Sequence, residues 1–293
     1  MNKGQSILSV MRGLAMLAGL FTLAGCSGQA LVNGLTPSWG YELTRDIAYG
    51  DEQRQKLDVY VPKDKADQAP VVVYFYGGRW EEGSKEQYKF LAQAMTSRGY
   101  IAVVADYRLY PQVKFPTFVE DGAQAVAWAR THASEYGGDP GKLVVMGHSA
   151  GAHIAAMLAM NGEYLQAVGG SRAWLAGMVG LAGPYDFLPL KAADLKDMFG
   201  PPERYPLSQP INYVDGKNPP LLLLHGLGDE TVFPKNTRNL AKAVAEKNGP
   251  VAIKLYPDIG HIKLVANLAA PLRFMGEQLD DISGFIDEIT SND

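Results

Sequence analysis

The sequence is organised around an apolar run that ends in a serine between glycines, Lys142-Leu143-Val144-Val145-Met146-Gly147-His148-Ser149-Ala150-Gly151. A second apolar stretch follows at residues 153–160. This succession predicts a buried strand, a sharp turn and a helix. In a G-x-S-x-G turn of this kind, the serine takes a sparsely populated backbone conformation at the tip, with its hydroxyl clear of the sheet. A glycine-rich turn without chemistry has the same pattern, so the rest of the chain must distinguish the two.

The glycines and the start of the helix give this turn a mechanical role. A side chain at Gly147 or Gly151 would collide with the crossing strand and helix. The first turn of the helix points unpaired N–H groups and a partial positive charge at whatever lies above the Ser149 hydroxyl. The pattern therefore predicts a nucleophile with hydrogen-bond donors beside it.

Composition narrows the class of protein. The chain has 293 residues, of which 47% are hydrophobic and 20% charged, as in an ordinary globular protein. Its formal net charge is −4 and it has no run of Lys or Arg, so nucleic acid is not an expected partner. Because Cys26 is the only cysteine, a disulfide within the chain is excluded and a cysteine metal site is not expected.

The N-terminus has the pattern of a secretory signal. Residues 1–12 carry Lys3 and Arg12 but no acid, and residues 13–23 form an apolar run. As a helix that run would cover only ~16 Å of a ~30 Å hydrocarbon core, which favours a signal peptide over a membrane span. It ends in Leu23-Ala24-Gly25-Cys26, which resembles the lipobox of bacterial lipoproteins. We predict a lipoprotein signal peptide at 1–25; an ordinary cleaved signal or a buried core cysteine are the alternatives.

The lipobox resemblance implies a membrane partner. Two or three acyl chains on Cys26 would anchor the protein stably, at ~0.8 kcal/mol for each buried CH₂. In that family an Asp after the cysteine favours the inner membrane, whereas Ser27 stands here. We therefore expect a lipid-anchored protein of the bacterial cell envelope, on the outer membrane and facing the periplasm or the cell surface. Residues 26–40 are predicted to be the lipid-anchored tether.

Residues 41–293 predict one domain in which strands and helices alternate. The first two strands suit an antiparallel edge, and the later apolar runs suit parallel strands with right-handed crossovers and helices on both faces. A capping box, Thr117 with Glu120, is expected to open the second helix. The expected strands are 41–49, 55–61, 71–76, 101–105, 143–146, 177–181, 221–225 and 251–256, and the expected helices are 85–98, 117–132, 150–161, 234–248 and 271–289.

Four segments that contain residues suited to catalysis directly follow predicted strands. Because ligands bind at the carboxyl ends of parallel strands, we expect these segments to meet at one edge of the sheet. They are Tyr76-Gly77-Gly78-Arg79-Trp80, the Ser149 turn, the loop with Asp229 and the loop with His261.

A serine hydroxyl needs an adjacent base, and histidine with a buried carboxylate behind it suits that role near neutral pH. Of the five histidines, His261 is preferred, because the order Ser149, Asp229, His261 matches the chain order of the motif's fold. His225 is expected to brace the loop to Asp229. Glu230, Asp186 and Asp258 are the alternatives for the acid. We expect backbone N–H groups of Ala150 and of Gly77-Gly78 to donate hydrogen bonds to the developing oxyanion. The alternative interpretation of Gly77-Gly78 is a plain turn without a catalytic role.

Together these motifs resemble an α/β-hydrolase of the esterase/lipase type, close to the hormone-sensitive-lipase-like and feruloyl-esterase-like bacterial carboxylesterases. The resemblance runs from about residue 58 to residue 261. Its marks are Tyr76-Gly77-Gly78-Arg79-Trp80, Asp106-Tyr107-Arg108-Leu109-Tyr110-Pro111, Phe115-Pro116, Gly147-His148-Ser149-Ala150-Gly151, His225-Gly226 with Asp229, and Gly260-His261.

The resemblance implies an α/β-hydrolase fold, with a mostly parallel central sheet, helices on both faces and a small cap insertion at 185–220. It implies that Ser149 is the nucleophile, Asp229 the orienting acid and His261 the base, and that Gly77, Gly78 and Ala150 form the oxyanion hole. The implied reaction is hydrolysis of small carboxylic esters through an acyl-enzyme. No cofactor or metal is expected. An arylformamidase or other amidase, or a non-catalytic anchored binding protein, are the alternatives.

The pocket candidates are Tyr76, Arg79, Trp80 and His148. Many relatives carry His-Gly-Gly-Gly where this chain has Tyr76-Gly77-Gly78-Arg79. Arg79 is either a cation that selects an acidic acyl or leaving group, or one half of an ion pair that holds the loop. The apolar residues of the cap are expected to form the cap's own core rather than the pocket; they are Phe187, Leu188, Leu190, Met198, Phe199 and Tyr205.

Overall fold

The computed structural model describes residues 28, 30–64 and 67–291. The predicted signal peptide at 1–25 and the predicted lipidation site Cys26 lie outside the described residues. Within the described part, none of the helices combines the length and the apolar character that a bilayer crossing needs.

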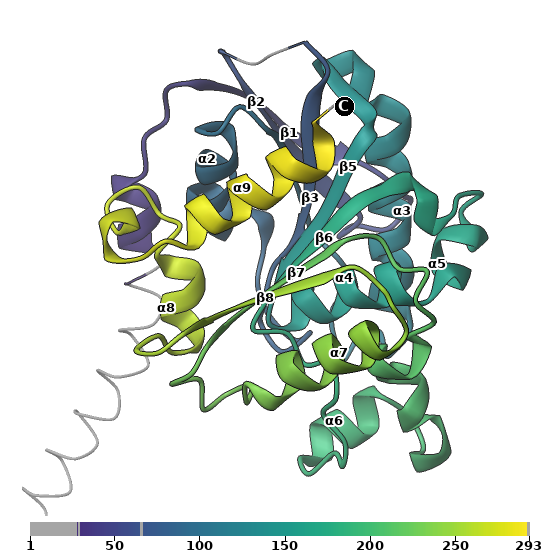
Figure 1. Ribbon diagram of the computed structural model, residues 1–293. Helices are drawn as coiled ribbons and strands as arrows, with labels where there is room; N and C mark the ends of the chain where they lie inside the picture. The colour runs from purple at the N-terminus through teal and green to yellow at the C-terminus, as the bar shows by residue number, and fades with distance from the viewer. Residues whose placement is uncertain (1–27, 29, 65–66, 292–293) are drawn as a thin grey trace, which may run out of the picture.

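The centre of the domain is one eight-stranded sheet in the order β1-β2-β4-β3-β5-β6-β7-β8 (Figure 1). β2 runs antiparallel to β1 and β4, and every other neighbouring pair is parallel. All eight predicted strands are therefore confirmed, including the antiparallel edge. The bounds are β1 (Tyr41–Ala48), β2 (Lys56–Pro62), β3 (Ala69–Phe75), β4 (Ile101–Ala105), β5 (Gly138–His148), β6 (Leu175–Leu181), β7 (Leu221–Gly226) and β8 (Val251–Tyr256).

Helices cover both faces of the sheet, as predicted. α2 (Lys89–Thr96) and α9 (Gln278–Thr290) pack on one face, and α3 (Thr117–His132), α4 (Ala150–Met160) and α7 (Lys235–Glu246) pack on the other (Figure 1). The shorter elements are α5 (Gly162–Ala167), α6 (Ala193–Met198), α8 (His261–Ala266), η1 (Lys85–Tyr88), η2 (Ala133–Tyr136), η3 (Arg172–Trp174), η4 (Pro202–Ser208), η5 (Pro210–Tyr213) and η6 (Arg273–Met275).

The central strand β3 and the helix α4 are apolar on every side because both are buried on every side. β3 is covered on both faces, and Val72, Val73 and Tyr74 are fully buried. Every residue of α4 is buried as well, because the helix lies between the sheet and α3. Continuous apolar runs are the sequence pattern that such double burial requires. The helix that follows Ser149 is thus fixed at the centre of the molecule.

Some predicted helix boundaries are wrong. The helix expected at 85–98 begins with the 3₁₀ turn η1, and the one expected at 271–289 begins at Gln278. The predicted capping box is also wrong, because the N-cap of α3 is Pro116 and no side chain caps it. The Glu120 amide, which Thr117 was expected to cap, donates to the Pro116 carbonyl at 3.2 Å.

The second half of the expected tether lies against the domain. Residues 30–35 are helical. Asn33 Nδ2 donates to the Gln87 carbonyl at 2.8 Å, and Asn33 Oδ1 accepts from the Phe90 amide at 3.2 Å. Lys89 Nζ donates to the Thr36 carbonyl at 2.9 Å and to Ser38 Oγ at 2.8 Å. These bonds fasten the stretch to η1 and α2.

Candidate active site

Ser149 lies at the tip of a tight turn between β5 and α4. Its φ of +54° and ψ of −121° lie in a sparsely populated region for a residue with a side chain. A Cβ on Gly147 would lie 2.2 Å from the Gly151 carbonyl oxygen, and one on Gly151 would lie 2.0 Å from that of Phe75. Both glycines are therefore required by the close crossing of backbone, for the reason predicted from the sequence.

Ser149, His261 and Asp229 form a continuous hydrogen-bonded relay. Ser149 Oγ lies 2.9 Å from His261 Nε2, and His261 Nδ1 lies 2.6 Å from Asp229 Oδ2. Since a carboxylate only accepts, Nδ1 carries the proton and leaves Nε2 free to accept from the hydroxyl. His261 stands at the start of α8 rather than in a plain loop. Asp186, an alternative acid, instead accepts from Asn239 at 2.6 Å.

Asp229 is held as a buried anion. Its side chain is 0% exposed. Burial opposes ionisation, but hydrogen bonds from His225, His261 and the Val232 amide outweigh that effect and hold the pKa of Asp229 well below its ordinary value. The Thr231 and Val232 amides each donate to Asp229 Oδ1 at 2.9 Å. The carboxylate can therefore orient His261 and stabilise a positive charge on it.

His225 braces the loop that carries Asp229, as expected. Its Nε2 lies 2.7 Å from the Val232 carbonyl and 3.3 Å from Asp229 Oδ2. Both of those groups are acceptors, so Nε2 carries a proton. The other ring nitrogen lies 2.7 Å from Thr237 Oγ1 on α7. The ring thus joins the end of β7, the Asp229 loop and α7.

The start of α4 and the loop after β3 both lie beside the serine. Ala150 is the first residue of α4, so its N–H has no acceptor within the helix. The loop after β3 passes directly against the turn, because a Cβ on Gly77 would lie 3.1 Å from Ser149 Cβ. Gly78 turns this loop at a φ of +128°, and its carbonyl accepts from the amides of Glu81 and Glu82.

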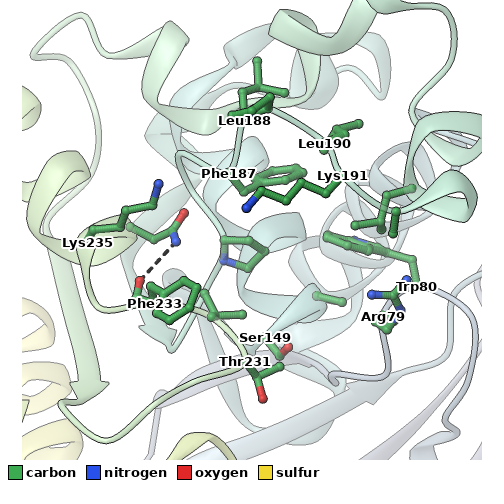
Figure 2. Close-up of a pocket in the computed structure, with 17 residues that line it drawn as sticks. Arg79, Trp80, Ser149, Phe187, Leu188, Leu190, Lys191, Thr231, Phe233 and Lys235 are labelled. Atoms are coloured by element: carbon green, nitrogen blue, oxygen red, sulfur yellow. Dashed lines mark hydrogen bonds between the residues drawn. The ribbon is translucent and has the colours of Figure 1, made fainter.

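The serine opens into a pocket of about 450 Å³ beneath the cap region (Figure 2). Most of its wall is apolar. The cap's Phe187, Leu188 and Leu190 line this pocket, so the prediction that they form the cap's own core is wrong for these three. Met198 and Phe199 are buried, as expected of a core. The complete lining is Arg79, Trp80, Ser149, Ala150, Pro184, Phe187, Leu188, Pro189, Leu190, Lys191, Ala192, Leu195, Thr231, Val232, Phe233, Lys235 and Asn236.

Trp80 and Arg79 line the pocket, but the two other predicted pocket residues do not. Tyr76 is fully buried and points away from the pocket; its hydroxyl lies 2.7 Å from Asp106 Oδ1. The reason is that its ring stacks on that of Tyr107, at 4.8 Å, beneath the loop. His148 is also buried, and its Nε2 lies 3.1 Å from the His261 carbonyl oxygen.

Arg79 connects the loop after β3 to the cap. Its guanidinium donates to Asp194 of α6, and Nε lies 3.8 Å from Glu81 Oε2. The hydrogen bond from Arg79 holds the pKa of Asp194 below its ordinary value. These contacts favour the ion-pair interpretation of Arg79 over direct recognition of an acidic substrate.

Sequence reasoning missed part of the pocket wall. Phe233 and Lys235 come from the segment after β7, and Lys191 from the cap. These residues could have been found from their place in the sequence, because Phe233 and Lys235 follow the loop of the predicted acid Asp229 and Lys191 lies in the predicted cap insertion. Across residues 28, 30–64 and 67–291, no three His, Cys, Asp or Glu side chains gather in a way that could hold a metal ion.

A family model described as BD-FAE matches residues 57–244, which is more than half of the chain. The chain belongs to the BD-FAE family. The match includes Ser149 and Asp229 and ends before His261.

Curated relatives of this BD-FAE protein are named esterases. It is 29% identical over 295 residues to the probable isoprenylcysteine alpha-carbonyl methylesterase ICMEL1 of Arabidopsis thaliana, covering 89% of this chain and 60% of the relative. It is 30% identical over 242 residues to esterase LipC of Mycobacterium tuberculosis, covering 75% and 60% respectively. The chain thus spans about 60% of the length of these relatives.

Solved structures confirm the α/β-hydrolase fold of this BD-FAE protein. A truncated carbohydrate esterase from gut microbiota superposes with a TM-score of 0.76 at 19% identity, over 88% of this chain and 100% of that one. Thermogutta terrifontis esterase 2 phosphoramylated by tabun gives a TM-score of 0.72 at 25% identity, over 87% and 96%. The first likeness bears on the fold alone.

Proposed function

We propose that this BD-FAE protein is a serine carboxylesterase that cleaves small carboxylic esters through an acyl-enzyme. The observation that carries the proposal is the relay of 2.9 Å and 2.6 Å from Ser149 through His261 to Asp229, at the base of an apolar pocket. The names of its relatives, methylesterase and esterase, support it.

In the first half of the reaction, Ser149 Oγ attacks the ester carbonyl carbon while its proton passes to His261 Nε2. The carbonyl electron pair moves to oxygen, and the oxyanion is bound by the amides of Ala150 and of the Gly77-Gly78 loop. The buried Asp229 anion stabilises the imidazolium. When the carbonyl re-forms, the alcohol leaves and takes the proton from His261, so that an acyl-enzyme remains.

In the second half, water replaces the alcohol. His261 takes a proton from the water as its oxygen attacks the acyl carbon, and the same amides bind the second oxyanion. Collapse releases the carboxylic acid and returns the proton from His261 to Ser149 Oγ. Nothing in this cycle consumes a cofactor, since the proton moves only between the substrate, water and the relay.

The test is hydrolysis of p-nitrophenyl acetate, butyrate and octanoate by residues 27–293, beside Ser149→Ala. We expect turnover that falls by roughly 10⁶-fold in the variant, and a chain-length profile that measures the pocket. Turnover equal in both proteins would contradict the proposal. An anilide and formanilide series run in parallel identifies the amidase alternative, and absence of turnover on both series identifies a binding protein.

An organophosphate gives an independent readout. Esterase 2 of Thermogutta terrifontis has been solved phosphorylated by paraoxon. Paraoxon treatment of this protein should add one diethylphosphoryl group to the peptide that carries Ser149 and abolish ester turnover together. Labelling elsewhere, or equal labelling of Ser149→Ala, would count against Ser149 as the nucleophile.

We also propose that Cys26 is lipidated and that the protein is anchored in the bacterial cell envelope, on the outer membrane. The lipobox-like tetrapeptide and Ser27 support this. In a bacterial host, an alkyne fatty acid should label the full chain but not Cys26→Ser, and the labelled protein should sediment with outer-membrane fractions. Labelling of neither protein would contradict the anchor.

A further inference from the structure

The pocket carries a charge opposite to that of the whole chain. The chain has 31 acidic residues and 27 Lys and Arg residues. The pocket lining contains Arg79, Lys191 and Lys235 but no Asp or Glu. A cleft lined by one sign of charge concentrates its field on a bound molecule of the opposite sign.

The three cations are not equivalent. Arg79 is neutralised by Asp194 and Glu81. For Lys191 and Lys235, the described part of the chain offers no acidic side chain within 4.0 Å. Their charge is therefore available to a ligand, whereas that of Arg79 is used within the protein.

The two lysines lie on opposite flanks of the pocket. Lys191 extends from the cap and Lys235 from the start of α7, and Figure 2 shows their amine ends turned toward one another. In this view Phe233 lies between Lys235 and Ser149, and Phe187 lies beside Lys191; both line a pocket whose wall is mostly apolar. A ligand that reaches from Ser149 to the amines therefore crosses apolar surface before it meets positive charge.

The position of Lys235 is electrostatically unfavourable for the helix. It is the first residue of the 12-residue α7, whose first turn contains no acid. The N-terminal end of a helix carries partial positive charge and is stabilised by acidic residues, so a lysine there opposes the helix dipole. Lys235 and the positive end of α7 thus reinforce each other at the pocket, which is the arrangement that binds an anion.

We propose that the preferred substrate is an ester whose bound half is apolar beside the scissile carbonyl and ends in a carboxylate, which Lys191 and Lys235 bind. This inference rests on the proposed esterase function and adds the substrate class to it. Each contact is a solvent-exposed ion pair, so each lysine should change the preference for the anion by roughly two- to five-fold. The preference should weaken as salt screens the charges.

The test compares anionic and neutral esters of matched length. p-Nitrophenyl hemiglutarate against p-nitrophenyl valerate places the carboxylate on the acyl side, and p-carboxyphenyl butyrate against phenyl butyrate places it on the alcohol side. The readout is the ratio of kcat/KM for the anionic ester to that for its neutral partner. In one of the two pairs we expect this ratio to exceed one at low ionic strength and to fall toward one at about 0.5 M salt.

Lys191→Gln and Lys235→Gln should each lower that ratio, and the double variant should lower it further. Lys196→Gln is the matched control, because Lys196 is an exposed lysine of α6 that does not line the pocket; its ratio and its neutral-ester activity should equal those of the wild type. Two results overturn this inference but leave the proposed esterase function intact. In the first, neutral esters are hydrolysed but the anionic-to-neutral ratio of kcat/KM is at or below one in both pairs. In the second, the double variant has the same ratio as the wild type. If the wild type hydrolyses none of the esters, the proposed function itself is overturned.

Discussion

His148 Nε2 donates a hydrogen bond to the backbone carbonyl of His261 over 3.1 Å, and the two imidazole rings lie 4.7 Å apart. Because a carbonyl only accepts, the proton of His148 is on Nε2. Burial lowers the pKa of His148 to about 3. His148 is therefore a neutral donor at physiological pH, and it holds the backbone of the proposed base without adding a charge that would oppose the imidazolium.

Loss of the His148 donor should therefore displace His261. We expect His148→Ala to lower kcat by roughly ten-fold with a smaller change in KM, the effect of one hydrogen bond on a reacting geometry. His148→Gln, which keeps a side-chain donor, should restore part of kcat. Circular dichroism checks that both variants fold. Equal kcat for the Ala variant and the wild type, or an Ala and a Gln variant that are equally impaired, would show that His148 does not position His261.

Asp229 should matter for both rate and acid stability. Asp229→Asn should lower kcat by roughly 10⁴-fold, as the same exchange does in a serine protease, because an amide favours the wrong tautomer of His261. Since the folded-state pKa is lowered, the ionised carboxylate contributes stability above its unfolded pKa of about 3.9, and this is lost as pH falls through the folded pKa. Urea midpoints between about pH 6 and pH 2 should therefore fall more steeply for the wild type than for Asp229→Asn. Parallel curves would contradict this assignment.

His153 is a second buried neutral histidine with a different consequence. Burial lowers its pKa to about 4, and its Nε2 lies 2.7 Å from the Ser208 carbonyl oxygen. Unfolding raises that pKa to about 6.5, so stability is fully present above pH 6.5 and declines as pH falls toward 4. The loss should be on the order of 3 kcal/mol. His153→Gln, which keeps a donor but does not titrate, should lack this part of the decline in urea unfolding. The same slope in both proteins would contradict it.

Arg79 should act on all substrates alike. Because its guanidinium is paired with Asp194 on α6, Arg79→Ala should loosen the contact between the loop and the cap. We expect kcat/KM to fall by a similar factor, roughly two- to five-fold, on neutral and anionic esters. Asp194→Asn should have a similar effect. A selective loss on anionic esters would instead restore Arg79 as an anion-binding residue.

The Ser149–His261–Asp229 relay could be predicted because each of the three residues follows a strand that the hydrophobic pattern of the sequence locates. Ser149, Asp229 and His261 come after β5, β7 and β8, and parallel strands end at one edge. Tyr76 and His148 also follow or end strands, yet neither lines the pocket: Tyr76 points into the core, and His148 lies against His261. Which side of the sheet edge such a side chain faces depends on the turn of the backbone, which the apolar pattern does not encode.

The cap was the least readable part of the pocket. Residues 185–220 contain many prolines and little periodicity, so no face of the segment could be assigned inward or outward. Phe187 lines the pocket and Phe199 lies in the core, although both are large and apolar. Both rings pack on Trp80, at 6.1 Å for Phe187 and 5.0 Å for Phe199, so the face that each turns to the pocket depends on tertiary packing, which the sequence pattern does not encode.

The bonds of Asn33 to η1 and α2 set the reach of the molecule. Cys26 stands seven positions before Asn33, a length of chain that could span at most about 25 Å even if it were fully extended. With acyl chains on Cys26, the folded domain would lie within that distance of the lipid headgroups. The anchored domain would then diffuse in the plane of the membrane. Esters close to the leaflet would meet the pocket far more often than esters dissolved in the bulk.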